Sequence, residues 1–150
     1  MDSFIPWVGG KKSLRKEIVK KFPEKIDRYV EVFGGAAWVL FYKEKYAEQE
    51  IYNDINGELV NLFKMVKYHP KALQEELQFT LNAKEIFDDF RVQKGLTELQ
   101  RAARFYYLIR MSYGADTKSY GGNYRSPYLF SKDVEAISQR LKKVIVLMKY

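Results

Sequence analysis

Hydrophobic and polar positions follow two patterns along the chain, one typical of short buried strands and one of amphipathic helices. Residues 29–33, 50–54 and 144–148 are short runs rich in β-branched, aromatic or other large apolar residues, which favours strands. After each of the first two runs, apolar residues recur at helical spacing, within 40–45 and then within 59–66. The order strand, helix, strand, helix predicts a parallel sheet with helical crossovers, and therefore an α/β fold.

A helical segment interrupts the predicted sheet. From His69 to about residue 111 the apolar spacing is helical only, and the capping box "TELQ" at 97–100 opens its longest helix. Residues 112–130 hold three glycines, four tyrosines and two basic residues, and a loop of this length in a compact domain is usually functional or disordered. Ser131 then caps a helix that leads into the last strand. These changes of pattern divide the chain into residues 1–68, 69–130 and 131–150.

The N-terminal segment is strongly basic. The whole chain has 26 Lys and Arg against 19 Asp and Glu, a formal net charge of +7, and eight of the basic residues lie within 11–28 against three acids. This segment predicts an amphipathic helix that Ser13 caps and Pro23 ends. A basic excess favours a polyanionic partner, and the Arg and Lys residues interleaved with tyrosines within 104–128 favour nucleic acid. A merely solvated helix face is the alternative.

Composition narrows the possible chemistry. The chain has no cysteine, which excludes disulfides and thiolate chemistry, and the single His69 argues against a multi-histidine metal site or a serine-histidine triad. No apolar run approaches the roughly 20 residues that cross a bilayer, and the first residues do not resemble a signal peptide. We therefore expect a cytoplasmic protein without metal or membrane, whose chemistry relies on carboxylates, amides, aromatic rings and backbone.

The first predicted strand runs directly into the turn "FGGAA". Gly34 and Asp54 are about 20 residues apart, as in nucleotide-binding βαβ units, where glycines expose the backbone and a carboxylate accepts hydrogen bonds from a ribose diol. The turn is not G-x-G-x-x-G, and Ala37 and Trp38 occupy the position where a pyrophosphate would sit, so a cofactor without phosphates fits better. Close helix packing by the glycines and a helix-capping role for Asp54 are the alternatives.

Three motifs, "PWVGGKKSL", "YVEVFGGAA" and "YNDIN", occur in one order along this chain. With them the chain resembles the Dam-like DNA adenine methyltransferases, which use S-adenosylmethionine, over nearly its whole length. "AARFYYLIRMSYG" and the Gly-Tyr-Arg-rich segment after it are similar to that family's helical target-recognition region and DNA-contacting loop. The resemblance implies a partial Rossmann-like methyltransferase sheet with a helical target-recognition insert, and double-stranded DNA as the partner.

The resemblance also implies which residues form the site. It places Lys11 near the methionine carboxylate, Asp54 on the ribose hydroxyls and Ile55 beside the adenine. The full cofactor set is Trp7, Gly10, Lys11, Glu31, Phe33, Gly35, Asp54 and Ile55. For DNA contact we expect Arg110, Lys118, Tyr120, Asn123 and Arg125, with a solvated loop as the alternative for each. Where the family usually has another glycine or small residue, this chain has Ala37 followed by the bulky Trp38.

The sequence lacks the catalytic motif of that family. Methyl transfer to the adenine amine needs a flipped base, an acceptor for its developing charge and a stacking aromatic, which an Asp-Pro-Pro-Tyr-type motif supplies. This sequence has no Pro-Pro dipeptide, and "SPY" at 126–128 lies in the predicted loop. We assign no catalytic residue and expect little turnover from this chain alone.

Two hypotheses about function remain. The first is an adenine-specific DNA methyltransferase represented by its cofactor and recognition parts, as a truncated chain, a fragment, or one half of a split enzyme that a C-terminal chain complements. The second is a non-catalytic DNA- or cofactor-binding module, such as a phage or prophage remnant. An open parallel sheet also exposes an edge, so a homodimer is expected as well.

Overall fold

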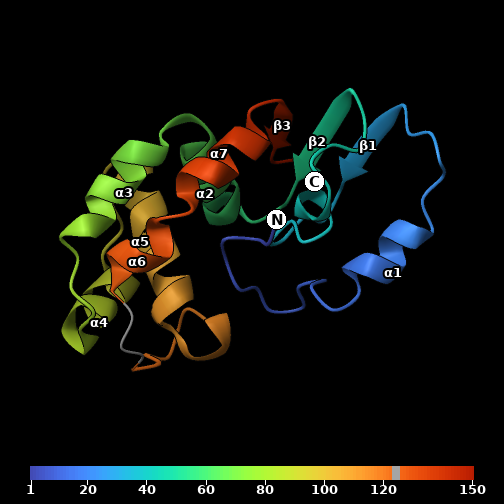
Figure 1. Cartoon of the computed structure of the whole chain (residues 1–150). Helices are drawn as coiled ribbons and strands as arrows, with labels where there is room; N and C mark the ends of the chain where they lie inside the picture. The colour runs from blue at the N-terminus through green and yellow to red at the C-terminus, as the bar shows by residue number, and fades with distance from the viewer. Residues whose placement is uncertain (123–125) are drawn as a thin grey trace.

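A parallel sheet of three short strands lies beside a group of packed helices (Figure 1). The computed structural model describes residues 1–122 and 126–150. The strands are β1 (Arg28–Glu31), β2 (Gln49–Asn53) and β3 (Val144–Leu147), in the order β1-β2-β3, and both neighbouring pairs are parallel. The three predicted strands and the α/β class are therefore confirmed.

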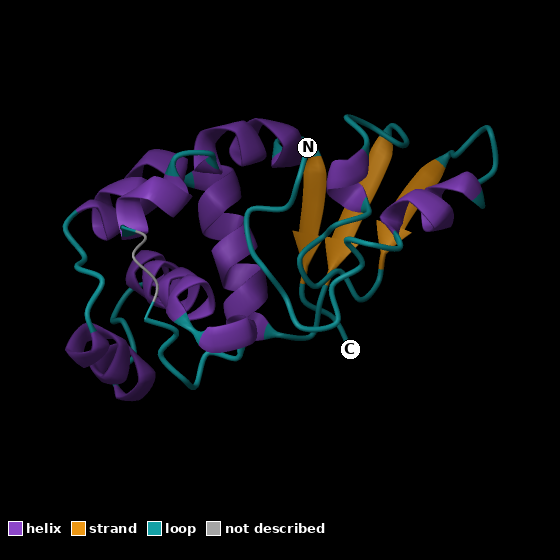
Figure 2. Ribbon diagram, turned by 60° about the horizontal axis from the view of Figure 1, so that its bottom comes forward, coloured by secondary structure: helices purple, strands orange, loops and turns teal. Residues whose placement is uncertain are grey.

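Most of the helices lie in the long connection between β2 and β3, but the first precedes β1. They are α1 (Arg15–Lys20), α2 (Gly57–Tyr68), α3 (Pro70–Gln78), α4 (Lys84–Val92), α5 (Glu98–Met111), α6 (Pro127–Ser131) and α7 (Val134–Leu141), with the 3-10 turns η1 (Leu40–Tyr42) and η2 (Tyr113–Ala115). Figure 2 shows α2 to α7 gathered on one side of the sheet. Among the described residues, no helix is both long enough and apolar enough to cross a membrane.

Helix starts and stops were predicted correctly in some places and wrongly in others. The capping box of α5 is confirmed, because Thr97 Oγ1 accepts from the Gln100 amide while the Gln100 side chain accepts from the Thr97 amide. The Ser13 cap is wrong, since Leu14 precedes α1 without a side-chain cap bond. The Ser131 cap is also wrong. Ser131 ends α6 and donates to a carbonyl within it, and Asp133 precedes α7.

The prediction of a helix after the first strand is wrong. Only the 3-10 turn η1 forms, and Lys43 ends it in an extended conformation. The backbone before η1 is held in a different shape, because Ala37 takes a left-handed conformation (φ +54°). The Leu40 amide then donates to the Glu31 carboxylate (3.1 Å). Apolar spacing alone does not reveal such a local turn.

The sheet is covered on one face. Tyr29, Tyr52 and Val144 lie on the buried face, where Tyr29 stacks on Tyr46 and Tyr52 stacks on Phe63 of α2. Val30 and Ile145 on the other face are 44% and 41% exposed. Val30 lies opposite Ile51, and Ile51 lies opposite Ile145, so these apolar residues form one row across the strands. Parallel sheets are normally buried on both faces, so this row is an uncovered apolar surface.

Candidate functional site

The carboxyl ends of the parallel strands place the turn after β1 beside the residue after β2. Asp54 is 9% exposed and accepts two backbone hydrogen bonds, from the Gly35 amide to Oδ2 (2.8 Å) and from the Asn56 amide to Oδ1 (2.9 Å). The cap of α2 itself is Asn56, whose side chain accepts from the Leu59 amide (3.1 Å). Each carboxylate oxygen keeps further acceptor capacity, so Asp54 can bind a hydroxyl without releasing the turn.

The two glycines of the turn have different structural roles. A Cβ on Gly34 would lie 2.2 Å from the Tyr52 ring, so only glycine allows this approach. Gly35 has φ +51°, a conformation that glycine adopts without strain, and its carbonyl oxygen accepts from the Tyr52 hydroxyl (2.7 Å). Gly34 therefore packs closely against a tyrosine of strand β2, and not against a helix as the alternative for the glycines predicted.

The N-terminal segment and the turn after β1 interlock through the two tryptophans of the chain. A Cβ on Gly10 would lie 2.9 Å from the Trp38 indole, and a Cβ on Gly35 would lie 2.9 Å from the Trp7 indole. We call these four residues the glycine–tryptophan junction. Trp38 is 8% exposed, and the Lys12 ammonium lies over its ring, 4.9 Å from the centroid. The bulky Trp38 is thus accommodated by Gly10 and by the basic segment.

Three further residues of the predicted cofactor set are accessible. Phe33 and Ile55, which follow β1 and β2, are 85% and 55% exposed. Lys11 is exposed and donates to the Gly9 carbonyl (3.0 Å). The carboxyl edge of the sheet therefore offers two apolar side chains, a carboxylate and a nearby cation.

Glu31 is partly buried and hydrogen bonded to the turn after β1, and the positive charge of Lys11 also acts on it. Its Oε2 accepts from the Tyr29 hydroxyl (3.0 Å) and from the Leu40 amide (3.1 Å), so it fixes the start of η1. Burial raises the pKa of Glu31 to about 7, against the lowering effect of these hydrogen bonds. Through these hydrogen bonds, Glu31 stabilises the turn after β1.

A cleft of about 270 Å³ adjoins the junction. Trp7 and Asn56 line it on the sheet side, and Phe105 of α5 and Thr117 line it on the helical side. The rings of Trp7 and Phe105 lie 6.3 Å apart. Thr117 has φ +60°, a genuine outlier for a β-branched residue, and such strain is found preferentially at functional sites. The cleft lies between the predicted cofactor and DNA regions.

The segment after α5 folds back onto that helix. Ser112 and Tyr120 form an antiparallel bridge, and the Gly121 amide donates to the Met111 carbonyl (2.7 Å). Asp116 closes the turn, and hydrogen bonds from Ser119 and from the backbone lower the pKa of Asp116 to about 2. Lys118 is exposed on this turn. The predicted long loop is therefore a closed turn over residues 112–121.

The predicted DNA-contact residues differ in whether their side chains are packed against the protein or exposed. Tyr120 packs on Phe87 (ring centroids 5.6 Å apart) and its hydroxyl donates to Asn82 (2.6 Å). Arg110 donates to the Phe4 carbonyl (3.4 Å) and also lies over an aromatic ring. These two side chains are turned inward and Lys118 outward. Asn123 and Arg125 lie outside the described residues. Pro127 and Tyr128 of "SPY" form the first turn of α6.

Sequence reasoning missed Tyr52. Its hydroxyl holds the Gly35 carbonyl, and its ring stacks on Phe63 at 4.2 Å. A signal was present, because alternation along β2 places Tyr52 on the buried face, where a tyrosine hydroxyl usually needs a partner. Tyr52 is thus the residue that fixes the turn from within the core.

Known proteins similar to this chain are DNA methyltransferases. The family described as "D12 class N6 adenine-specific DNA methyltransferase" matches residues 7–149. The chain is 30% identical to "Type II methyltransferase M1.LlaDCHI" of Lactococcus lactis subsp. cremoris, over 92% of this chain and 54% of that protein. It is 30% identical to "Type II methyltransferase M.MjaIII" of Methanocaldococcus jannaschii, over 96% and 60%. It is 28% identical to a "DNA adenine methylase" of Vibrio cholerae, over 94% and 55%.

The chain spans a little over half the length of these relatives. The family match nevertheless covers nearly all residues of this chain, including the glycine–tryptophan junction, Asp54 and the turn after α5. The predicted Dam-like resemblance is confirmed, and the chain belongs to the D12 class of N6 adenine-specific DNA methyltransferases.

Proposed function

We propose that this chain is the cofactor-binding and target-recognition part of an enzyme that methylates the exocyclic amine of adenine in double-stranded DNA. The observation that carries the proposal is the fixed contact between Asp54 and the Gly35 amide at the carboxyl edge of the sheet. Open parallel sheets bind ligands at this edge. Relatives named as DNA adenine methylases support the substrate. Residues 1–68 and 131–150 form the cofactor part in this proposal, and 69–130 the recognition part.

The residues at the edge fit S-adenosylmethionine, which supplies an activated methyl group when bound. Asp54 retains acceptor capacity for the ribose hydroxyls while it holds the Gly35 and Asn56 amides. The exposed side chains of Phe33 and Ile55 offer apolar surface to a flat purine. Lys11 supplies a positive charge for the methionine carboxylate. Glu31 and the glycine–tryptophan junction hold the turn in shape.

The DNA part of the proposal is supported by charge and by position. Lys118 projects from the turn after α5, and Asn123 and Arg125 follow it in the sequence. Tyr120 and Arg110 act in this proposal by fixing the turn and the end of α5. The net charge of +7 favours a polyanion. No residue of this chain is assigned to the methyl-transfer step itself.

The test is a calorimetric titration with S-adenosylmethionine. Tryptophan fluorescence gives a second signal, because both tryptophans lie in the junction. Asp54→Ala is expected to weaken binding by about 1 to 3 kcal/mol, as for the loss of charged hydrogen bonds. Asp54→Asn keeps one acceptor oxygen, so it removes the charge and one of the two backbone hydrogen bonds, whereas Asp54→Ala removes the charge and both. Asp27→Asn is the matched control, because that carboxylate is 91% exposed just before β1.

Two results would contradict the cofactor proposal. One is a folded wild-type chain, shown by circular dichroism, that does not bind S-adenosylmethionine. The other is Asp54→Asn with the affinity of the Asp27→Asn control. DNA is tested separately with an adenine-containing duplex at low salt, where phosphate contacts are strongest. Failure to bind duplex under those conditions removes the DNA part of the proposal.

A further inference from the structure

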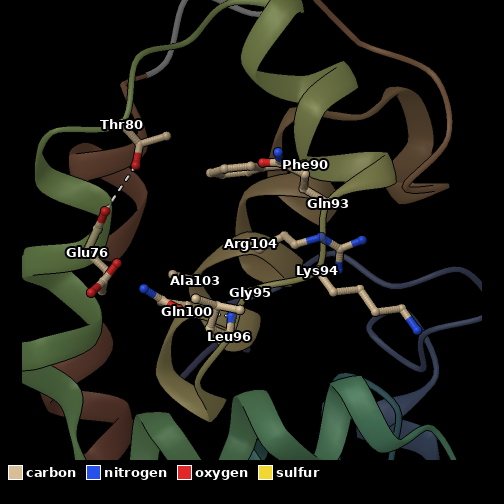
Figure 3. Close-up of a pocket in the computed structure, with 10 residues that line it drawn as sticks. All are labelled: Glu76, Thr80, Phe90, Gln93, Lys94, Gly95, Leu96, Gln100, Ala103 and Arg104. Carbon is tan, nitrogen blue, oxygen red and sulfur yellow. Dashed lines mark hydrogen bonds between the residues drawn. The ribbon is translucent and has the colours of Figure 1, made fainter.

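Three hollows lie next to one another along α5, beginning with the cleft beside Trp7, and together we call them the α5 groove. Phe105 and Thr117 line this cleft and also a second hollow further along the helix. Arg104 lines the second hollow and also a cavity of about 300 Å³ between α3, α4 and α5. Figure 3 shows Arg104 in that cavity, between Phe90 and the segment around Gly95. The shared residues show that the three hollows adjoin one another, with the first beside the candidate cofactor site.

The middle of this groove is positively charged. Arg91, Arg104 and Lys118 line it together with one acid, Glu58. That acid already pairs through Oε1 with Arg101. Arg91 lies 3.9 Å from an acid of its own helix and is 46% exposed, so it remains available to a ligand. The groove therefore carries an excess of positive charge beside an apolar wall.

Arg104 has hydrogen-bonding capacity that its surroundings leave unused. Its Nε is buried without a hydrogen-bond partner in the described part of the chain, and its Nη2 makes only a long contact to the Arg91 carbonyl (3.5 Å). Burial lowers the pKa of Arg104, so the groups around the guanidinium do not fully compensate its charge. Glu58 Oε2 is also buried and unpaired. Buried donors of this kind normally have an acceptor.

We propose that Arg91 and Arg104, together with Lys118, bind the phosphate backbone of the DNA strand that leads to the cofactor site. This inference rests on the proposed function and adds two arginines to the expected contact residues. Phosphate oxygens are acceptors that a guanidinium fork favours, and Arg104 Nη2, which makes only the long contact to the Arg91 carbonyl, is the donor that such an oxygen would meet. The apolar wall formed by Phe105 and Leu108 lies along the α5 groove.

The experiment measures DNA binding of the full chain as a function of salt. Fluorescence anisotropy with a labelled adenine-containing duplex compares wild type with Arg104→Gln and Arg91→Gln. Each variant is expected to bind about 10-fold more weakly at low salt. The slope of log K against log salt should shrink by about one for each lost phosphate contact. Arg28→Gln is the matched control, because Arg28 is exposed at the amino end of β1, at the opposite edge of the sheet.

The outcomes separate this inference from the proposed function. Wild-type binding with an unchanged affinity and salt slope for Arg104→Gln overturns the inference and leaves the DNA proposal intact. An equal loss for Arg28→Gln also overturns it, because the effect is then one of net charge. If Arg104 only pairs with Glu58, Arg104→Gln lowers the free energy of unfolding in urea but leaves the salt slope unchanged. A wild type that binds no duplex at low salt overturns both.

Discussion

Alanine substitutions at Gly34 and Gly35, with Gly9 as a reference outside their turn, separate the backbone and packing reasons for glycine in the turn after β1. Gly9 has φ +73° and an added Cβ would meet no atom within 4 Å, so Gly9→Ala tests conformation alone. Gly35 has φ +51° and an added Cβ would lie 2.9 Å from Trp7. Gly34 has no positive φ, and an added Cβ would lie 2.2 Å from the Tyr52 ring. The three substitutions therefore test strain, strain with a contact, and contact only.

The structure predicts the order in which the three substitutions lower the free energy of unfolding. A left-handed conformation costs an alanine roughly 1 to 2 kcal/mol, which is the whole expected effect of Gly9→Ala. Gly35→Ala adds a contact with a half-buried side chain that can shift, so about 2 to 3 kcal/mol is expected. Gly34→Ala meets Tyr52, which is fully buried, stacked on Phe63 and hydrogen bonded to the turn. Because Tyr52 cannot shift, we expect a loss of about 3 kcal/mol or more.

The assay is urea unfolding followed by circular dichroism, with the midpoint and the slope fitted separately. A loss of about 3 kcal/mol is a large part of the roughly 5 to 15 kcal/mol that stabilises a typical domain. Gly34→Ala should therefore unfold at a much lower urea concentration than the other two. If Gly34→Ala is as stable as Gly9→Ala, the contact with Tyr52 is not the reason for a glycine at position 34.

Three further predictions concern the buried Glu31, the ion pair of Arg140 with Glu50, and the uncovered apolar row on the sheet. Burial raises the pKa of Glu31 to about 7 from an ordinary 4.5, so between these values the folded chain binds more protons than the unfolded chain. The free energy of unfolding should fall as the pH rises through this window, and Glu31→Gln should flatten the fall in urea titrations at several pH values. Arg140→Met should cost about 3 to 5 kcal/mol of unfolding free energy, because it leaves the buried Glu50 carboxylate without its counter-charge; adding Glu50→Met should recover the part of the loss that is due to this charge, but not the hydrogen bonds of Arg140 to the Leu40 and Lys43 carbonyls. The uncovered row containing Ile145 should cause self-association, which light scattering at high concentration detects and Ile145→Lys abolishes. A wild type that stays monomeric there contradicts the last expectation.

The sheet could be predicted from the sequence because each strand combines large apolar residues with a clear boundary. The start of α5 was predictable too, because Thr97 and Gln100 form both bonds of a capping box. Ser13 and Ser131 have the same residue types expected of caps, yet neither caps a helix. Capping depends on backbone conformation before the first turn, and in α1 the preceding residue Leu14 is itself helical (φ −93°, ψ −14°). Residue type does not encode that conformation.

The site was predictable only where it follows directly from strand direction. The carboxyl ends of neighbouring parallel strands must meet, so Gly35 and Asp54 come together as their positions in the sequence indicate. The inward direction of Tyr120 depends on Asn82, which lies 38 residues earlier on a different segment. Contacts of that kind arise from helix packing and leave no local pattern.

Asp54 connects the stability of the turn with its capacity to bind a ligand. Its two backbone hydrogen bonds join the turn after β1 to the start of α2, and the Tyr52 hydroxyl holds the same turn from the core. A carboxylate fixed in this way loses little freedom when a ligand hydroxyl binds, so the cost of ordering falls on folding and not on binding. For the same reason, a change at Asp54 alters folding and binding together. The Asp54→Asn variant is therefore more informative than Asp54→Ala, since it removes the charge but retains an oxygen for one of the two backbone hydrogen bonds.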